Sequence, residues 1–123
     1  MFKNIILMAI VALLLVTNQT FLKKGLRMIG ELKINNLHDL STIVLKLIQN
    51  KFIIIGLSLM VIGFLLWLTI ISRVDLTLAF PISSGIFYIL LFLSSWIFLG
   101  ETITLSKIIG AIAIIAGIFI ILK

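Results

Sequence analysis

The chain of 123 residues has no cysteine, a single proline, a single histidine and only four acidic residues. Without cysteine, neither a disulfide framework nor a cysteine-ligated zinc site can form. The lone histidine, His38, has no nearby partner for a metal, and no phosphate-binding glycine loop or nucleophile–base pair is recognisable. We therefore expect no metal, no cofactor and no enzymatic activity.

Charge is also scarce, at 11% of the residues, whereas hydrophobic residues make up 63%. A soluble domain is about half apolar and about a quarter charged, so a core of this size could not hide so much apolar side chain, and lipid must be part of the solvent. The net charge is +6, but the basic residues lie at the ends of apolar runs and do not alternate with aromatics. This pattern indicates membrane lipid, and not nucleic acid, as the partner.

Four long apolar runs cover most of the chain, at about residues 4–22, 52–71, 76–99 and 104–122. Each is near the roughly 20 residues that an α-helix needs to cross about 30 Å of hydrocarbon, and none shows the period-two alternation of a barrel strand. The runs predict one all-α membrane domain over residues 1–123, with four transmembrane helices in an antiparallel bundle. A cleaved signal peptide is an alternative for the first run, but no A-x-A-like site follows Val16.

Between the first two runs, apolar residues recur at helical spacing over residues 37–49. They are Leu37, Leu40, Val44, Leu47 and Ile48. Asn36 followed by Asp39 fits an N-cap with an acidic first turn. We predict a short amphipathic helix lying in the membrane interface.

Lysine and arginine are distributed unevenly between the two sides of the predicted bundle. Loops one and three carry seven of them, namely Lys23, Lys24, Arg27, Lys33, Lys46, Lys51 and Lys107. The other side carries Lys3, Arg73 and Lys123. By the positive-inside rule, loops one and three are predicted to be cytoplasmic.

Two runs carry stripes of small residues at helical spacing. The stripe on the last run is Ser106, Gly110, Ala113 and Gly117, and the one on the second run is Gly56, Met60, Gly63 and Trp67. Small residues allow close helix packing in lipid. The stripes either pack helices within one chain, or the last one forms a dimer interface with a second copy or a paralogous subunit.

Several short motifs accompany these stripes. They are A-F-P at 79–81, Ser84-Gly85, Ser95-Trp96, Gly100-Glu101, and Gly110 with Gly117. Because of these motifs, residues 72–122 resemble the C-terminal half of EamA-like and small multidrug resistance proteins of the drug/metabolite transporter superfamily. Trp67 stands where such proteins carry a tryptophan, and residues 18–25 (N-Q-T-F-L-K-K-G) are similar to a G-Q-x-x-x-K element of the four-helix members. The resemblance implies a four-helix protomer in the bacterial inner membrane that works as a homo- or heterodimer.

One departure from that family pattern concerns the first run. Small multidrug resistance proteins use a membrane-embedded Glu there to exchange protons for cationic drugs, whereas this chain has no acid in the run. A buried carboxylate is what would attract a cation and change protonation within the membrane. The pattern is therefore nearest to the Glu-free flippase subunits that move aminoarabinose attached to undecaprenyl phosphate.

Polar residues within the runs are the candidate substrate contacts. Gln19 shares a face with Ala9, Ala12 and Val16 and is predicted either to hydrogen-bond a sugar or to bond a neighbouring helix. Lys23, one turn further on, is either an interfacial anchor or the contact for a substrate phosphate.

A second set of candidates follows Pro81, which should free the carbonyl of Thr77 and bend the third helix. Ser83, Ser84 and Tyr88 lie just beyond it, and together with Trp67 they are predicted to line a cavity. The alternative is that the serines bond back to their own helix.

The sequence thus favours a transporter or flippase protomer that moves an amphipathic, lipid-linked solute by alternating access. The alternatives are a small multidrug or metabolite exporter that lacks the usual Glu, and a membrane scaffold subunit without transport activity.

Overall fold

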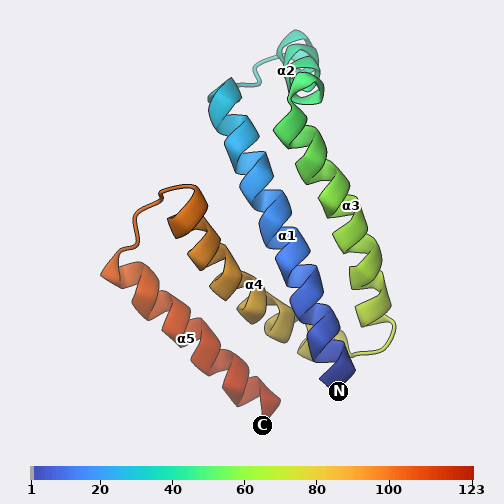
Figure 1. Cartoon of the computed structure of the whole chain (residues 1–123), viewed down its shortest axis with the longest axis vertical. Coiled ribbons are helices and arrows are strands. Elements are labelled where there is room, and N and C mark those ends of the chain that lie inside the picture. The colour runs from blue at the N-terminus through green and yellow to red at the C-terminus, as the bar shows by residue number, and fades with distance from the viewer. Residues whose placement is uncertain (1) are drawn as a thin grey trace.

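The computed structural model describes residues 2–123, and the regular structure in this range is entirely α-helical (Figure 1). The helices are α1 (Phe2–Ile29), α2 (Leu37–Gln49), α3 (Lys51–Ile71), α4 (Leu76–Phe98) and α5 (Leu105–Leu122). Four of them, α1, α3, α4 and α5, are long and apolar enough to cross a membrane. The prediction of an all-α, four-span membrane protein is confirmed.

The first span is longer than the sequence predicted. Hydropathy placed its end near residue 22, but α1 continues to Ile29. Its 28 residues extend over about 42 Å at 1.5 Å per residue, more than the roughly 30 Å of hydrocarbon. The added turns contain Lys23, Lys24 and Arg27, which are good helix formers and whose long side chains can reach the headgroup region.

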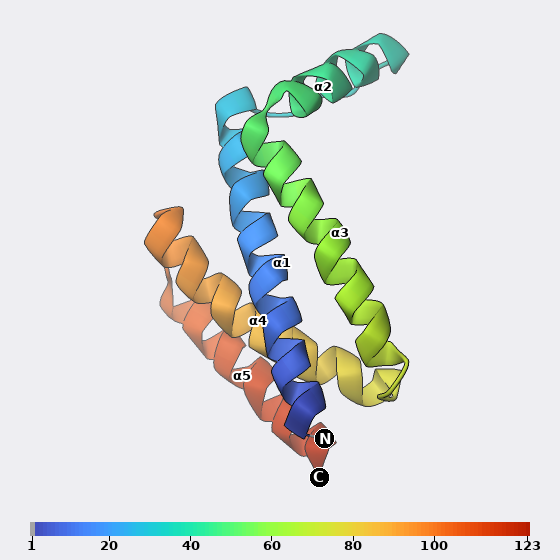
Figure 2. The same cartoon turned by 45° about the vertical axis from the view of Figure 1, so that its right-hand side comes forward.

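The amphipathic helix is confirmed as α2, which projects outward from the start of α3 in Figure 2. The Asn36 side chain accepts a hydrogen bond from the Asp39 N–H at 2.9 Å, as the N-cap prediction required. Of the α2 residues only Ile43 is buried, while Leu37, Leu40, Val44 and Ile48 of the predicted apolar face are exposed on the protomer.

Asn50 connects α2, α3 and α1. Its Oδ1 accepts from the N–H groups of Phe52 and Ile53, which caps α3, and its Nδ2 donates to the Gly25 carbonyl of α1 at 3.3 Å. Asp75 occupies the N-cap position of α4, but its side chain makes no capping hydrogen bond.

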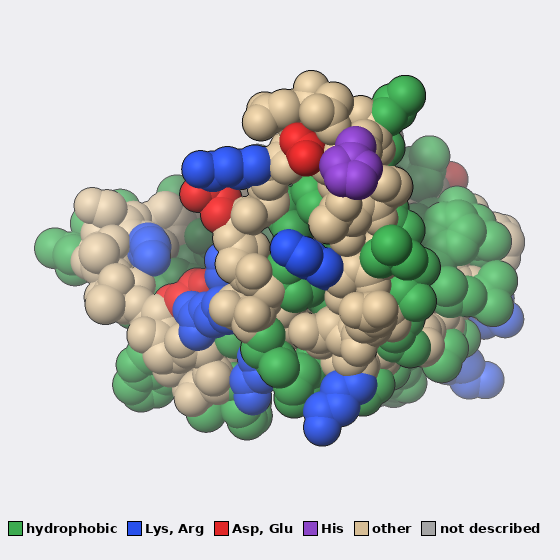
Figure 3. Space-filling model, turned by 90° about the horizontal axis from the view of Figure 1, so that it is seen from above, with side chains coloured by type: hydrophobic (Ala, Val, Ile, Leu, Met, Phe, Trp, Pro, Cys, Tyr) green, Lys and Arg blue, Asp and Glu red, His purple; other side chains and the backbone are tan. Residues whose placement is uncertain are grey.

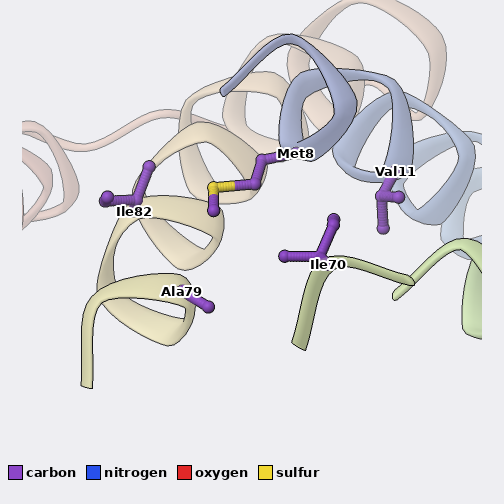
Figure 4. Packing of buried hydrophobic residues seen from close by; sticks show 5 residues of the cluster. All are labelled: Met8, Val11, Ile70, Ala79 and Ile82. Atoms are coloured by element: carbon purple, nitrogen blue, oxygen red, sulfur yellow. The ribbon is translucent and has the colours of Figure 1, made fainter. Parts of the chain in front are cut away.

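Helix α1 is the centre of the fold, because it packs against both α3 and α4. Residues from these three helices form the core in Figure 4, which shows Met8, Val11, Ile70, Ala79 and Ile82 pointing toward one another. Toward the end of the molecule that carries α2, α4 diverges from α1 (Figures 1 and 2).

The small-residue stripe on α3 packs within the chain. A Cβ atom on Gly56 would lie 2.9 Å from the Leu22 side chain and 3.1 Å from the Asn18 carbonyl oxygen of α1. Gly63 similarly approaches Leu15. These glycines therefore allow α1 and α3 to come close together, so the intrachain alternative holds for this helix.

Helix α5 is the least covered element, since no residue between Leu105 and Leu122 is buried. It packs on α4 through a face that includes Ile118, which contacts Gly85. The stripe lies elsewhere on the helix, and nothing approaches within 4 Å of the Cβ positions of Gly110 and Gly117. Within the protomer, therefore, these two glycines of the α5 stripe pack against no other helix.

Candidate functional site

A cavity of about 330 Å³ lies between α1, α3 and α4. We call it the central cavity. It brings together three of the predicted substrate contacts, Trp67, Ser83 and Ser84. The remaining lining is Val11, Ala12, Leu15, Met60, Gly63, Phe64, Phe80 and Phe87.

Aromatic rings and hydroxyl groups determine the chemistry of the central cavity. Trp67 and Phe80 meet edge to face, with ring centroids 5.1 Å apart. No lysine, arginine, aspartate or glutamate is among the lining residues. The Ser83 Oγ is buried and has no hydrogen-bond partner within residues 2–123. A buried hydroxyl without a partner is costly, so Ser83 is the polar group of the cavity wall whose hydrogen-bonding capacity is unused.

A second hollow of about 440 Å³ lies between α1 and α4, where these helices diverge. We call it the α1–α4 groove. Its lining is Leu13, Val16, Thr17, Thr20, Phe21, Lys24, Leu90, Leu93, Ser94, Ile97 and Phe98. Thr20 Oγ1 and Ser94 Oγ form a hydrogen bond of 2.6 Å across the two helices. Lys24 is the one charged residue in the lining, and its Nζ lies 5.9 Å from the centroid of the Phe98 ring.

The other predicted contacts lie outside the central cavity. Gln19 and Lys23 are exposed and line neither hollow. Gln19 contacts no neighbouring helix within the protomer: Val16, one turn earlier on the same row, is buried, but the side chain of Gln19 is exposed. Tyr88 lines a separate pocket of about 170 Å³ with Ser95, Glu101 and Lys107.

Asn18 is the polar residue that sequence reasoning missed. Its side chain is fully buried, and within the described chain neither amide atom has a hydrogen-bond partner. The reason is helical geometry, because Asn18 shares a face with Leu15 and Leu22, which contact the glycines of α3. The spacing of Gly56 and Gly63 in the sequence indicated a close-packed face on α3, but not that Asn18 of α1 would lie against it.

Among residues 2–123 no group of three histidine or acidic side chains is placed to hold a metal ion. The sequence model of the EamA-like transporter family matches residues 2–123. No curated protein and no solved structure matches the chain.

Proposed function

Because the chain belongs to the EamA-like transporter family, within the drug/metabolite transporter superfamily, we propose that it is one protomer of a dimeric transporter. The proposed substrate is an amphipathic, lipid-linked solute such as an undecaprenyl-phosphate sugar. The protein would move it across the bacterial inner membrane by alternating access, with loops one and three in the cytoplasm.

The observation that supports this function best is the central cavity. Its wall is apolar and aromatic, it contains no charged side chain, and the Ser83 hydroxyl lacks a partner. A solute with a hydrocarbon part and hydroxyl groups satisfies both requirements, because burial of its chain is favourable in such a wall and one of its polar atoms can bond Ser83.

The distribution of acids supports a substrate other than a proton-exchanged cation. No aspartate or glutamate lies in α1, α3, α4 or α5. Exchange of a proton for a cation within the bilayer depends on a buried carboxylate that both ions can share. The protomer has no such group in its described spans, so a lipid-linked phosphate fits better than an organic cation coupled to protons.

The uncovered surfaces of the protomer support a dimer. The α5 stripe is open, and Gln19 and Lys23 share a face of α1 that no other helix covers. In a dimer, this α1 face would form part of the wall between protomers, with Gln19 near the sugar and Lys23 at the phosphate.

A second candidate is supported by the aromatic rings of the central cavity. Trp67 together with Phe64, Phe80 and Phe87 could hold a quaternary ammonium ion by cation–π contacts, which need no carboxylate. The protein would then be a drug exporter with another mode of coupling.

The third alternative is a scaffold subunit without transport activity. In that case substitutions in the central cavity would leave function intact, and only substitutions in the α5 stripe would impair it.

The discriminating experiment reconstitutes the protein in vesicles, alone and together with any four-helix paralogue that the same genome encodes. One assay follows an undecaprenyl-phosphate aminosugar and another follows a quaternary ammonium dye. Movement of the lipid-linked sugar that is reduced by Trp67→Ala supports the flippase. Movement of the dye alone supports the exporter, and movement of neither contradicts both.

A further inference from the structure

The α1–α4 groove differs from the central cavity in its chemistry. We propose that it binds one acyl chain of an anionic phospholipid of the bilayer, with the lipid phosphate at Lys24. The site would be separate from the substrate cavity, since α1 presents Leu13, Thr17 and Thr20 to the groove and Val11, Ala12 and Leu15 to the cavity.

The hydroxyl groups in the groove already have hydrogen-bond partners. Thr17 Oγ1 donates to the Leu13 carbonyl at 2.7 Å, and Thr20 Oγ1 is bonded to the Val16 carbonyl and to Ser94. An occupant of this part of the groove therefore needs no polar atoms of its own, unlike an occupant of the central cavity, where the Ser83 Oγ lacks a partner. Hydrocarbon fits such a surface without leaving a polar group unsatisfied.

The length of the groove fits one leaflet. On α1 its lining runs from Leu13 to Lys24, which is about 16 Å along a helix axis at 1.5 Å per residue. Half of the roughly 30 Å hydrocarbon thickness is about 15 Å. An acyl chain that ends near Leu13 therefore places its headgroup at the level of Lys24.

Lys24 is the cation available to a headgroup at this position. Arg27, the next basic residue of α1, is held by the Leu99 carbonyl at 2.7 Å and lies 3.8 Å from the Glu101 carboxylate. Lys24 forms no salt bridge within residues 2–123, and its ammonium group lies over the Phe98 ring in a cation–π contact. A phosphate bound there would provide the counter-charge for the ammonium group.

The charge of this end of the molecule favours the same occupant. Seven of the ten basic residues and three of the four acidic ones lie on this side of the spans, which leaves it with a net positive charge, and Figure 3 shows Lys and Arg side chains spread over it with Asp and Glu side chains among them. The predicted orientation places it at the cytoplasmic leaflet, whose anionic lipids attract basic residues near the surface.

The test measures lipid retention by the purified full-length protein in mild detergent, by native mass spectrometry. The protein is first equilibrated with equal amounts of phosphatidylglycerol and phosphatidylcholine of the same chain length. Wild type should retain several-fold more phosphatidylglycerol, Lys24→Gln should lose most of this preference, and the control Lys46→Gln, at an exposed position outside the groove, should keep it. Equal retention of the two lipids by wild type, or an unchanged preference in Lys24→Gln, overturns the proposal.

A second variant tests the chain-binding part of the groove. Leu93→Trp adds a ring to its wall and should lower retention of both lipids at least two-fold, whereas Leu57→Trp, on an exposed face of α3 outside the groove, should not. Retention unaffected by Leu93→Trp contradicts the site. Displacement of phosphatidylglycerol by equimolar undecaprenyl phosphate also contradicts it, because the groove would then belong to the substrate path. Inorganic phosphate should displace nothing.

Discussion

At the scale of single residues, Ser83 provides the most direct test of the central cavity. Ser83→Ala removes the buried hydroxyl that lacks a partner, so protein stability should be unchanged or slightly higher. Substrate binding should weaken several-fold, because a hydrogen bond made with the substrate is lost. Transport assays over a range of substrate concentrations, paired with melting curves, measure both effects.

The matched control for Ser83 is Ser58→Ala on α3. Ser58 Oγ already donates to the Ile54 carbonyl at 2.9 Å and does not line the central cavity. Transport should therefore be normal in this variant. If Ser83→Ala also transports normally, the hydroxyl does not contact the substrate.

Asn18 permits a stability prediction. Its amide is buried between α1 and α3, with both polar atoms unpaired. Asn18→Leu should therefore stabilise the protomer by about 1–3 kcal/mol, and Gln19→Leu, at the exposed neighbouring position, should change stability much less. Thermal unfolding in detergent measures the difference. A loss of stability in Asn18→Leu would show that the amide has a partner.

The two adjacent lysines of α1 are predicted to act differently in transport. Lys23→Ala should slow movement of a lipid-linked phosphate by removing its cationic contact, while Lys24→Ala, at the α1–α4 groove, should change it less. Initial rates in vesicles compare the two variants. Equal and negligible effects would support a role for Lys23 as an interfacial anchor only.

At the scale of helices, most boundaries could be predicted from hydropathy. The predicted limits of α3, α4 and α5 agree with the structure to within one residue, because loops with polar or charged residues interrupt the apolar runs. The end of α1 was missed because a lysine- and arginine-rich segment is compatible with a helix outside the hydrocarbon. The directions in which the Gln19 and Asn18 side chains point were also missed. Successive residues of a helix are rotated by about 100° around its axis, so the two side chains face different neighbours, and hydropathy does not show which of them faces α3.

Helix packing should respond oppositely to the same substitution at two glycines. Gly56→Ala places a methyl group against Leu22 and the Asn18 carbonyl oxygen, so α1 and α3 must separate, with a cost of about 1–3 kcal/mol. In Gly110→Ala the added methyl group has no neighbour within 4 Å on the protomer. This substitution should be neutral or stabilising, since alanine is more favourable than glycine in a helix by about 1 kcal/mol. Melting curves of the two variants check this, and equal effects would contradict the packing.

At the scale of the whole molecule, hydropathy could predict four spans but not which helices touch. The pairing of α1 with both α3 and α4, and the position of α5 against α4, depend on side-chain fit between segments distant in the sequence. For the same reason Trp67, Ser83 and Ser84 meet in one cavity, whereas Tyr88 lies in another pocket.

The exposed stripe of α5 leads to a prediction about assembly. Leucine at both Gly110 and Gly117 should lower the dimer fraction at least several-fold, because bulky side chains prevent close helix approach. Ala116→Leu, on the same helix but off the stripe, is the control and should leave the dimer intact. Cross-linking in membranes and sedimentation in detergent measure the dimer fraction. An unchanged dimer fraction in the double variant would show that the interface does not include the α5 stripe.

The central claim is that this protomer belongs to a transporter of lipid-linked solutes, and the initial rate of transbilayer movement of an undecaprenyl-phosphate aminosugar tests it most directly. Vesicles that contain the protein, with its paralogous subunit if one is required, should move the lipid well above protein-free vesicles. The rate should fall with Trp67→Ala and with the double substitution at Gly110 and Gly117. A rate equal to that of protein-free vesicles under every pairing would contradict the claim.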